Sequence, residues 1–509
     1  MASFCRAAQA VDDKLVAFSG KEEAYTVPQQ TQRQKEGITS LSAGEMASAI
    51  RRREVLPTQL LDAHLDRIAR MNPQLNAFAY LDADGARRQA KEADAALGKG
   101  GPLGPLHGVP ISIKSSIDVA GWPSDCGSRL RAGYVAENDA TLVSRLRRAG
   151  AILLGNTNTP ELLMAYETDN VVRGKTNNPW NLQRTPGGSS GGEAAAIAAR
   201  CSAAGVGSDG GGSIRVPAHY SGICGLKPTP GRIPATGHFP VSSGPFALLG
   251  VVGPMARTVP DLQILFEVMA GLDYGDPSSS PVPLRRPGAA ELEHLRAGFF
   301  EEDGITPVTF ETSAAVQKAA AALSSAGMTV DKFLPEGLEV ARRLWWNLFG
   351  RAGELVLKPL LEGQESQLSP ILTEFTGIVR KEPRLTVDEL MKTLLERDDL
   401  RCRFLRQMER FPILICPVCA IPAFRHGERE WTVNGRTVNY LQAMSYSQWF
   451  NLLGNPAVVV PVGTSSEGLP IGVQVVGRPF EEEIVLAVAL KIEEACGNLR
   501  EPNLQMTGA

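Results

Sequence analysis

The first organised part of the chain carries apolar residues at helical spacing. Ser42 and Glu45 have the spacing of a capping box before such a stripe, and Pro57 is placed to open a second helix. Further helical patterns run over residues 85–97 and 140–149. We therefore predict four helices before residue 150.

Short apolar runs of the kind found in buried strands alternate with these helices. They cover residues 109–113 and 151–154, and two more lie later, over 457–462 and 471–476, before a final helix over 481–495. Alternating strands and helices predict an α/β fold built on a central sheet.

The remaining sequence divides around this core. Residues 1–37 are polar and lack sustained periodicity, so we expect a loosely ordered leader, and residues 501–509 are expected to form a short tail. The core domain is expected over residues 38–500. Within it, residues 292–443 are mostly helical and amphipathic, and we predict that the region of about 280–450 folds over the sheet as a helical cap.

Composition and charge narrow the class of protein. The chain has 509 residues, of which 43% are hydrophobic and 21% charged, so it can bury a large core. A net charge of -3 without a basic stripe argues against a nucleic-acid partner. No apolar run approaches the roughly 20 residues that span a bilayer, and Asp12 and Asp13 interrupt the place of a signal peptide's apolar core. We expect a cytoplasmic protein with reduced cysteines.

Two short motifs stand in the wrong context for the chemistry that they suggest. Residues 205–210 match the three spaced glycines of a dinucleotide site, but Pro217 and Pro228 prevent the long helix that should follow. Cys416 and Cys419 have the spacing of a redox or zinc half-site, yet their neighbours are apolar and the sequence has no second pair. We therefore predict neither a cofactor nor a metal, and interpret the two cysteines as core thiols.

A third motif requires a partner residue. Residues 187–191, Gly-Gly-Ser-Ser-Gly, match the turn that exposes a nucleophilic serine in many hydrolases, which then needs a histidine base. The histidines after this motif do not follow a matching acidic residue at a strand end. They are His219, His238, His294 and His426, of which only His426 stays open as a base. Alternatively, the two serines only cap a helix that begins at Gly191.

Three segments make chemical sense together. Lys114 ends an apolar strand within residues 110–118, one segment rich in glycine and serine covers 185–193, and a second covers 207–217. Nine of the 27 residues in 187–213 are glycine, which is needed where the backbone approaches a ligand closely. This is the part of the sequence where we expect the chemistry.

These three segments resemble the amidase signature family of serine hydrolases. Further matching segments extend the resemblance to roughly residues 40–495, and they are residues 155–161, 178–180, 224–229, 454–457 and 468–474. One departure is Ser115, which stands where many relatives carry an acidic residue after the lysine. The resemblance implies the amidase signature fold, in which a central mixed β-sheet is flanked by helices on both faces and carries a helical cap.

The resemblance also implies the catalytic residues. Ser213 would be the nucleophile, Ser189 a bridging serine that follows a cis peptide bond from Gly188, and Lys114 the base. Backbone amides of the glycine-rich loop would form an oxyanion hole, namely those of Gly210, Gly211, Gly212 and Ser213. Asp209 is expected either to order this loop or to form a turn.

Such chemistry is coherent without a histidine. A lysine accepts a proton only when it is neutral, so its pKa must fall from about 10.4 toward about 7 or 8, which burial can achieve. The apolar strand around Lys114 can supply that desolvation. The predicted reaction is acyl transfer to Ser213 followed by attack of water, on an amide or a related ester or carbamate.

The expected substrate is apolar or aromatic. Leu163, Met164 and Tyr166 lie where relatives that hydrolyse fatty or aryl amides place acyl-pocket side chains. Further aromatic walls could come from Trp345, Trp346, Tyr446, Trp449 and Phe450, and core packing is the alternative explanation for each of these residues. A carboxylate clamp is the competing hypothesis, and it would come from Arg173, Arg215 or Arg232.

Two other functions stay open. The chain could be the glutaminase-type subunit of an aminoacyl-tRNA amidotransferase, a relative that shares the triad and needs partner subunits. It could also be a nonenzymatic or nucleotide-binding α/β protein. The expected partner is a small-molecule amide, ester or carbamate, and a homodimer is the one assembly that we leave open.

Overall fold

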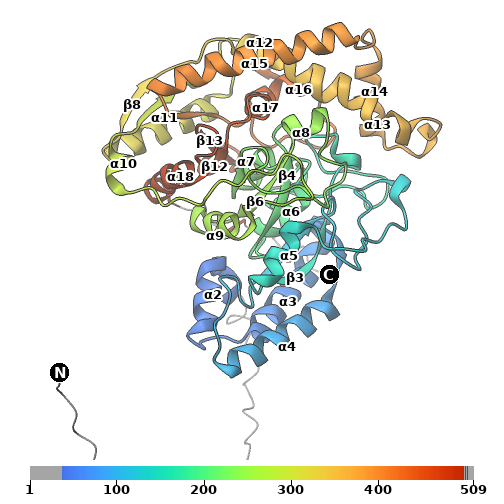
Figure 1. Cartoon of the computed structure of the whole chain (residues 1–509), viewed down its shortest axis with the longest axis vertical. Helices are drawn as coiled ribbons and strands as arrows, with labels where there is room; N and C mark the ends of the chain where they lie inside the picture. Colours follow the sequence, from blue (N-terminus) through green and yellow to red (C-terminus); the bar gives the residue numbers. More distant parts are fainter. Residues whose placement is uncertain (1–36, 498, 500, 503–509) are drawn as a thin grey trace, which may run out of the picture.

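A mixed sheet of eleven strands forms the centre of the molecule (Figure 1). In spatial order its strands are β1 (Phe78–Leu81), β3 (Ile152–Thr157), β2 (Pro110–Lys114), β4 (Ala204–Asp209), β6 (Val251–Ala256), β5 (Cys224–Lys227), β12 (Ala457–Thr464), β13 (Pro470–Val476), β9 (Ile413–Pro417), β7 (Arg296–Phe299) and β8 (Thr329–Lys332). The strands on either side of β2 and of β7 run parallel to them, and the other pairs are antiparallel. The α/β prediction is confirmed.

The computed structural model describes residues 37–497, 499, 501 and 502. Apart from Gly37, the predicted leader lies outside the described residues, as do residues 503–509 of the predicted tail. Among the residues that are described, no helix is both long and apolar enough to span a membrane.

The helices predicted from periodicity are present, with ends that differ by a few residues. They are α2 (Ala43–Arg51), α3 (Pro57–Leu75), α4 (Ala83–Lys99), α5 (Thr141–Arg148) and the final α18 (Glu482–Cys496). The capping box forms as expected, because Ser42 Oγ accepts from the Glu45 amide while Glu45 Oε2 accepts from the Ser42 amide at 2.7 Å.

Helices cover both faces of the sheet because strand side chains alternate between them. Val458 and Val460 of β12 belong to the hydrophobic core that contains α9 (Val259–Met269), α18 and part of α11 (Phe310–Ser325), whereas Val459 lies in a separate core. That second core contains α6 (Gly191–Ala198) and α7 (Arg215–Ser221) and continues into the cap.

The helical cap lies at the end of the molecule opposite α2 to α4 (Figure 1). It is built from α12 (Leu338–Trp346), a π-helical turn (Asn347–Ala352), α13 (Gly353–Leu361), α14 (Pro370–Arg380), α15 (Val387–Arg410), α16 (Tyr440–Ala443) and α17 (Ser445–Leu452). Short helices α8 (Pro245–Leu249) and α10 (Ala289–Glu293) complete the described set.

The region 292–443 is less uniformly helical than its amphipathic pattern suggests. It supplies β7, β8 and β9 to one edge of the main sheet, and β10 (Glu430–Val433) pairs with β11 (Arg436–Asn439) in a small hairpin. The edge strand β8 and its neighbour β7 have only four residues each and carry charges, with Arg296 paired to Asp331 at 2.6 Å. Short charged strands are typical of sheet edges and have no hydrophobic alternation to detect.

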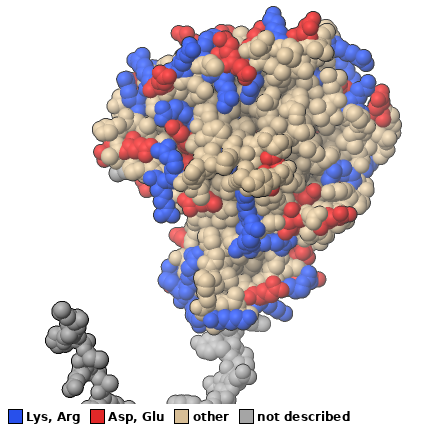
Figure 2. Space-filling view, in the orientation of Figure 1, with Lys and Arg blue, Asp and Glu red and all other residues tan. Residues whose placement is uncertain are grey.

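Charges are mixed over the surface. Figure 2 shows Lys and Arg interleaved with Asp and Glu on the visible face, without a continuous basic stripe.

Candidate active site

Two neighbouring parallel strands end at the centre of the candidate site. β2 ends at Lys114 and β4 ends at Asp209, so both residues lie at the same edge of the sheet. Ile111 and Ile113 pack into the core on one face of β2, and alternation therefore directs Lys114 to the opposite face, toward α6.

Lys114 is fully buried among serine oxygens. Its Nζ donates to Oγ of Ser189 at 2.7 Å, of Ser190 at 2.8 Å and of Ser208 at 3.0 Å. The side chain is 0% exposed. Ser190 and Ser208 were not predicted as neighbours of the lysine, because only the fold brings the end of β4 against the start of α6.

Burial lowers the pKa of Lys114 to about 7, because the ammonium form loses its hydration. The electrostatic effects of Cys126, Asp209 and Glu193 oppose this shift but do not cancel it. Burial also raises the pKa of Glu193 to about 7, although its carboxylate accepts a hydrogen bond from Thr157 Oγ1 at 2.8 Å. A substantial fraction of Lys114 is therefore a neutral amine near pH 7.

Ser189 is held by a tight turn at the start of α6. The peptide bond between Gly188 and Ser189 is cis, as the resemblance implied. A Cβ at Gly188 would lie 2.7 Å from backbone atoms of Ala165 and Glu167, so only glycine fits there. The Ser190 N–H donates to the Ser213 carbonyl at 3.1 Å, which joins the two segments rich in glycine and serine.

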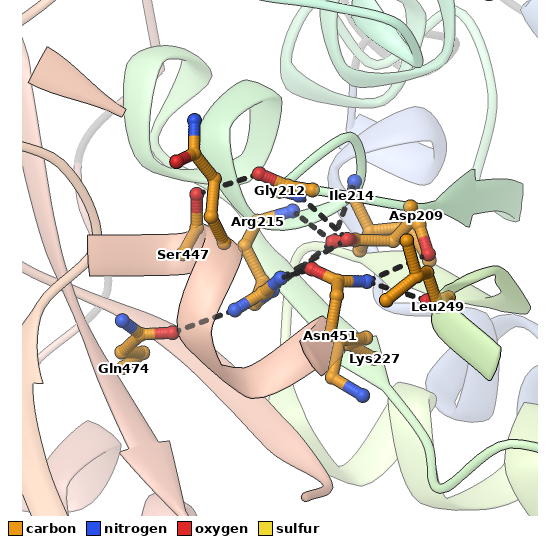
Figure 3. A network of polar contacts seen from close by, with 12 residues as sticks. Asp209, Gly212, Ile214, Arg215, Lys227, Leu249, Ser447, Asn451 and Gln474 are labelled. Atoms are coloured by element: carbon orange, nitrogen blue, oxygen red, sulfur yellow. Dashed lines mark hydrogen bonds and ion pairs between the residues drawn. The ribbon is translucent and has the colours of Figure 1, made fainter. Parts of the chain in front are cut away.

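Asp209 orders the loop that carries Ser213 (Figure 3). Its Oδ1 accepts from the Gly212 N–H at 2.7 Å, and its Oδ2 accepts from the Ile214 N–H at 3.1 Å. The Arg215 guanidinium donates hydrogen bonds to the same carboxylate from Nε and from Nη2, both at 3.0 Å. This confirms loop ordering over the simpler turn-forming interpretation of Asp209.

The ion pair of Asp209 and Arg215 is buried and fully partnered. Burial alone would raise the pKa of Asp209, but the charge and hydrogen bonds of Arg215 hold it well below its usual range. Arg215 Nη1 also donates to Gln474 Oε1 at 3.0 Å, and Asn451 Nδ2 donates to the Asp209 carbonyl at 3.0 Å (Figure 3). The loop is therefore anchored to β13 and α17 as well as to β4.

We expect Asp209→Asn to lower the free energy of unfolding by about 3–5 kcal/mol, because it leaves the buried Arg215 guanidinium without its counter-charge. Urea denaturation at neutral pH measures this loss. The matched control is Glu396→Gln, which breaks the ion pair of Glu396 with the largely exposed Arg343 and should cost far less. Equal losses for the two variants would contradict the prediction.

The loop leaves three backbone amides without an acceptor. Among the described residues, the N–H groups of Gly210, Gly211 and Ser213 make no hydrogen bond within the chain, whereas that of Gly212 is taken by Asp209. Gly212 adopts φ +124°, and a Cβ there would lie 2.3 Å from Ser447 Oγ. Gly212 is thus required by the shape of the loop, and the other three amides are available to a ligand.

Two cavities meet at Ser213, which is partly exposed. The first, here called the Ser189 cavity, is also lined by Ser189, Gly210, His238, Phe246 and Val252. The second, here called the Tyr166 cavity, is also lined by Tyr166, Gly211, Trp345, Phe375 and Tyr440. Leu163, Met164 and Phe349 line both of them. The three residues predicted to contact substrate are therefore brought to Ser213.

The other predicted aromatic residues divide into two groups. Trp345 lines the Tyr166 cavity, and Trp346 and Trp449 line a larger cavity under the cap. Tyr446 and Phe450 are packed in the core. Sequence reasoning missed Phe349, which stacks on Trp345 with ring centroids 4.7 Å apart, although its position one helical turn later could have indicated it.

The three arginines considered as a carboxylate clamp are engaged elsewhere. Arg215 pairs with Asp209, Arg232 pairs with Glu482 and Glu483, and Arg173 pairs with Asp125. Arg429, which was not predicted, lines the Tyr166 cavity, but it is paired with Glu167 at 2.7 Å and with Glu374 at 2.9 Å.

No histidine contacts either serine among the described residues. His238 lines the Ser189 cavity, but its ring nitrogens lie 3.3 Å from Ser116 Oγ and 3.0 Å from the Pro240 carbonyl. Burial, and then the charge of Lys114, lower its pKa to about 4. His426 lies 3.1 Å from Asn177 Oδ1, away from the serines.

The remaining motifs have structural explanations. Residues 205–209 lie inside β4 rather than in a turn between a strand and a helix, and a Cβ at Gly205 would collide with Glu193. Cys416 and Cys419 are buried free thiols in a hydrophobic core, as predicted. Within the described part of the chain, no group of three His, Cys, Asp or Glu residues could hold a metal ion.

Comparison with known proteins identifies the family of this chain. The sequence model of the family described as Amidase matches residues 59–486. The chain belongs to the amidase signature family. This amidase is 33% identical over 460 residues to an acylamidase of Rhodococcus erythropolis, an alignment that covers 89% of this chain and 95% of that protein. It is an amidohydrolase.

Two further relatives show the range of this family. The amidase is 34% identical over 500 residues to one subunit of the glutamyl-tRNA(Gln) amidotransferase of Acidothermus cellulolyticus, with 89% of this chain and 94% of that protein covered. The solved structure of a bacterial aryl acylamidase superposes with a TM-score of 0.79 at 27% identity, covering 89% of this chain and 96% of the other.

Proposed function

We propose that this amidase hydrolyses neutral amides at the C–N bond, and related carbamates or esters at the bond between the carbonyl carbon and the leaving group, through an acyl-enzyme on Ser213. Ser189 and neutral Lys114 form the proton relay. The observation that carries the proposal is the buried Lys114 Nζ, 2.7 Å from Ser189 Oγ, with its pKa lowered to about 7. An amine that is neutral near the working pH is an effective general base.

The relay accounts for every proton in the acylation step. Ser213 Oγ attacks the carbonyl carbon while its proton passes to Ser189 Oγ, and the proton of Ser189 passes to Lys114 Nζ. Collapse of the tetrahedral intermediate breaks the C–N bond, and a proton returns through Ser189 to the leaving nitrogen. Water then attacks the Ser213 ester with the same relay, which releases the carboxylic acid and restores the hydroxyl of Ser213.

The developing oxyanion needs donors that are already in place. The free N–H groups of Gly210, Gly211 and Ser213 can supply them, and the Asp209 carboxylate holds the loop in shape through the Gly212 N–H. Three of the four predicted donors are therefore kept in the proposed oxyanion hole, and Gly212 belongs to the scaffold of the loop.

The two cavities indicate the orientation in which the substrate binds. Ser189 must deliver a proton to the leaving nitrogen, and it lines the Ser189 cavity, so the amine part of the substrate lies there. The acyl part then lies in the Tyr166 cavity, where Leu163, Met164, Trp345 and Phe349 form apolar and aromatic walls.

We expect neutral p-nitroanilides and aryl carbamates with short or medium acyl groups to be better substrates than glutamine, by at least about 10²-fold in kcat/KM. Glutamine carries an ammonium and a carboxylate next to each other, and burying either without a partner is costly. Arg429, in the Tyr166 cavity, already has carboxylate partners. Steady-state assays of the purified chain with both substrate types measure the ratio.

A second candidate function follows from the amidotransferase relative. That subunit of glutamyl-tRNA(Gln) amidotransferase is as similar in sequence to this chain as the acylamidase is. If the purified chain prefers glutamine, or hydrolyses it only when partner subunits are added, the proposal of an independent amidase is wrong and the role in an amidotransferase replaces it.

A further inference from the structure

A large cavity lies under the cap and borders the Tyr166 cavity. Its volume is about 1170 Å³, and residues of α12, α14 and α16 line it. The two cavities share Trp345, Glu374, Ile378, Arg429, Tyr440 and Leu441 in their walls. A substrate acyl group that starts at Ser213 can therefore extend through the Tyr166 cavity into this cap cavity.

Most cationic side chains in the wall of the cap cavity are neutralised. Arg343 pairs with Glu396, Arg351 with Glu382 and Glu389, and Arg429 with Glu167 and Glu374; Lys392 lies 3.8 Å from Glu396. Arg342 differs. Among the described residues, its guanidinium has neither an ion pair nor a hydrogen bond, although it is partly buried.

The acidic group that interacts electrostatically with Arg342 does not form an ion pair with it. Asp303 also lines the cavity and interacts electrostatically with Arg342, but no ion pair joins the two side chains. Asp303 Oδ1 instead accepts from the backbone N–H groups of Ile305 and Thr306, at 2.9 and 2.7 Å. Arg342 therefore keeps its five donors for a ligand.

Two buried polar atoms in the same wall also lack partners. Ser445 and Gln448 are 2% and 0% exposed, and Ser445 Oγ and Gln448 Oε1 make no hydrogen bond among the described residues. Gln448 Nε2 donates to Tyr166 OH at 3.0 Å, which places this amide at the junction of the two cavities. Buried polar atoms without partners are unusual, and these two belong to residues in the wall of the cap cavity.

Helical spacing places Arg342 close to the reaction centre. Trp345 lies one turn after Arg342 on α12, and residues three apart share a helix face. The Trp345 indole donates to the Gly210 carbonyl at 2.9 Å, so this face of α12 contacts the loop of Ser213.

We propose that Arg342 binds a carboxylate at the far end of the substrate's acyl group, so that the preferred substrates are monoamides of dicarboxylic acids. This inference rests on the proposed function, because Ser213 still attacks an uncharged amide group and water still releases the acid, while the carboxylate lies at the other end of the acyl group. A guanidinium bound to a carboxylate is a strong, charge-assisted contact.

Matched substrates test the inference. The p-nitroanilides of succinic, glutaric and adipic acids carry a terminal carboxylate, and those of butyric, valeric and hexanoic acids are their neutral equivalents of the same chain length. We expect at least one carboxylated member to exceed its neutral equivalent in kcat/KM by about tenfold or more. Equal or lower values for all three would overturn the inference.

Variants of two adjacent arginines test which side chain causes the preference for the carboxylated substrates. Arg342→Met should remove the preference by raising KM for the carboxylated substrate, with little change for the neutral one, and Arg342→Lys should retain part of it. Arg343→Met is the control, because its guanidinium is already paired with Glu396. A preference that survives in Arg342→Met, or is lost in Arg343→Met, would overturn the inference.

The same experiment separates this inference from the proposed function. Turnover of the neutral anilides requires Ser213 but not Arg342. A wild-type enzyme that hydrolyses the neutral anilides but shows no preference for the carboxylated ones therefore refutes only the role of Arg342, whereas absence of turnover with every anilide refutes the proposed function. Protection of Ser213 from a fluorophosphonate by adipic acid monoanilide, compared with hexananilide, gives the same comparison from occupancy of the site.

Discussion

Ser213→Ala should lower kcat/KM for a neutral p-nitroanilide by at least about 10⁴-fold, because it removes the atom that forms the acyl-enzyme. The side chain is small and partly exposed, so little packing is lost and the fold should persist. Far-UV circular dichroism and the thermal midpoint check that persistence. The comparison variant is Ser144→Ala, on α5 and outside both cavities, which should retain wild-type rates.

Covalent labelling identifies the nucleophile directly. A fluorophosphonate should modify Ser213 in the wild-type protein, as located by mass spectrometry of the labelled peptide, and should not label Ser213→Ala. Modification of Ser189 or Ser190 would instead support the nucleophile turn in residues 187–191 and contradict the proposed relay.

Lys114→Met should lower kcat/KM by at least about 10²-fold, because the relay loses its base while the apolar part of the side chain is kept. The pH dependence of the rate is the more specific test. In the wild type, the rate should rise with pH through about 7 as Lys114 becomes neutral. In Lys114→Met the residual rate should lack this rise.

A second buried lysine provides the control. Lys227 is also 0% exposed, and burial lowers its pKa to about 7 as well, but its Nζ donates to the Pro228 carbonyl rather than to a serine. Lys227→Met should keep the rise in rate near pH 7. If that rise disappears with Lys227 and survives the loss of Lys114, the proposed base is wrong.

Lys114→Met also has a predictable effect on the free energy of unfolding. The folded-state pKa of Lys114 lies below its unfolded value, so between about pH 7 and 10 the unfolded chain binds a proton that the folded chain does not. Lys114 therefore costs stability near pH 7, by about 4–5 kcal/mol, and progressively less as the pH rises. The stability of Lys114→Met relative to wild type should be higher at pH 7 than at pH 10, measured by urea denaturation.

Local sequence patterns were sufficient to predict many of the helices, strands and motifs of this protein. The capping box at Ser42, the helix opened by Pro57 and the apolar runs of β2, β3, β12 and β13 are each visible within a few residues, since helical and strand periodicity are local properties. The lysine and the two glycine- and serine-rich segments were also recognised from the sequence, because their residues lie in short continuous motifs.

The parts of the site that the sequence did not predict depend on contacts between segments that are distant in the sequence. Lys114 meets Ser190 and Ser208 only because the start of α6 packs against the ends of β2 and β4. In the same way, the packing of the elements determines that Arg215 pairs with Asp209. It also determines that Arg342 has no partner among the described residues. A charged side chain is free or neutralised according to neighbours that lie far away in the sequence, and periodicity contains no information about them. For this reason short motifs alone were enough to locate the candidate site, whereas the packing of the fold sets which amides, arginines and aromatic rings line its cavities.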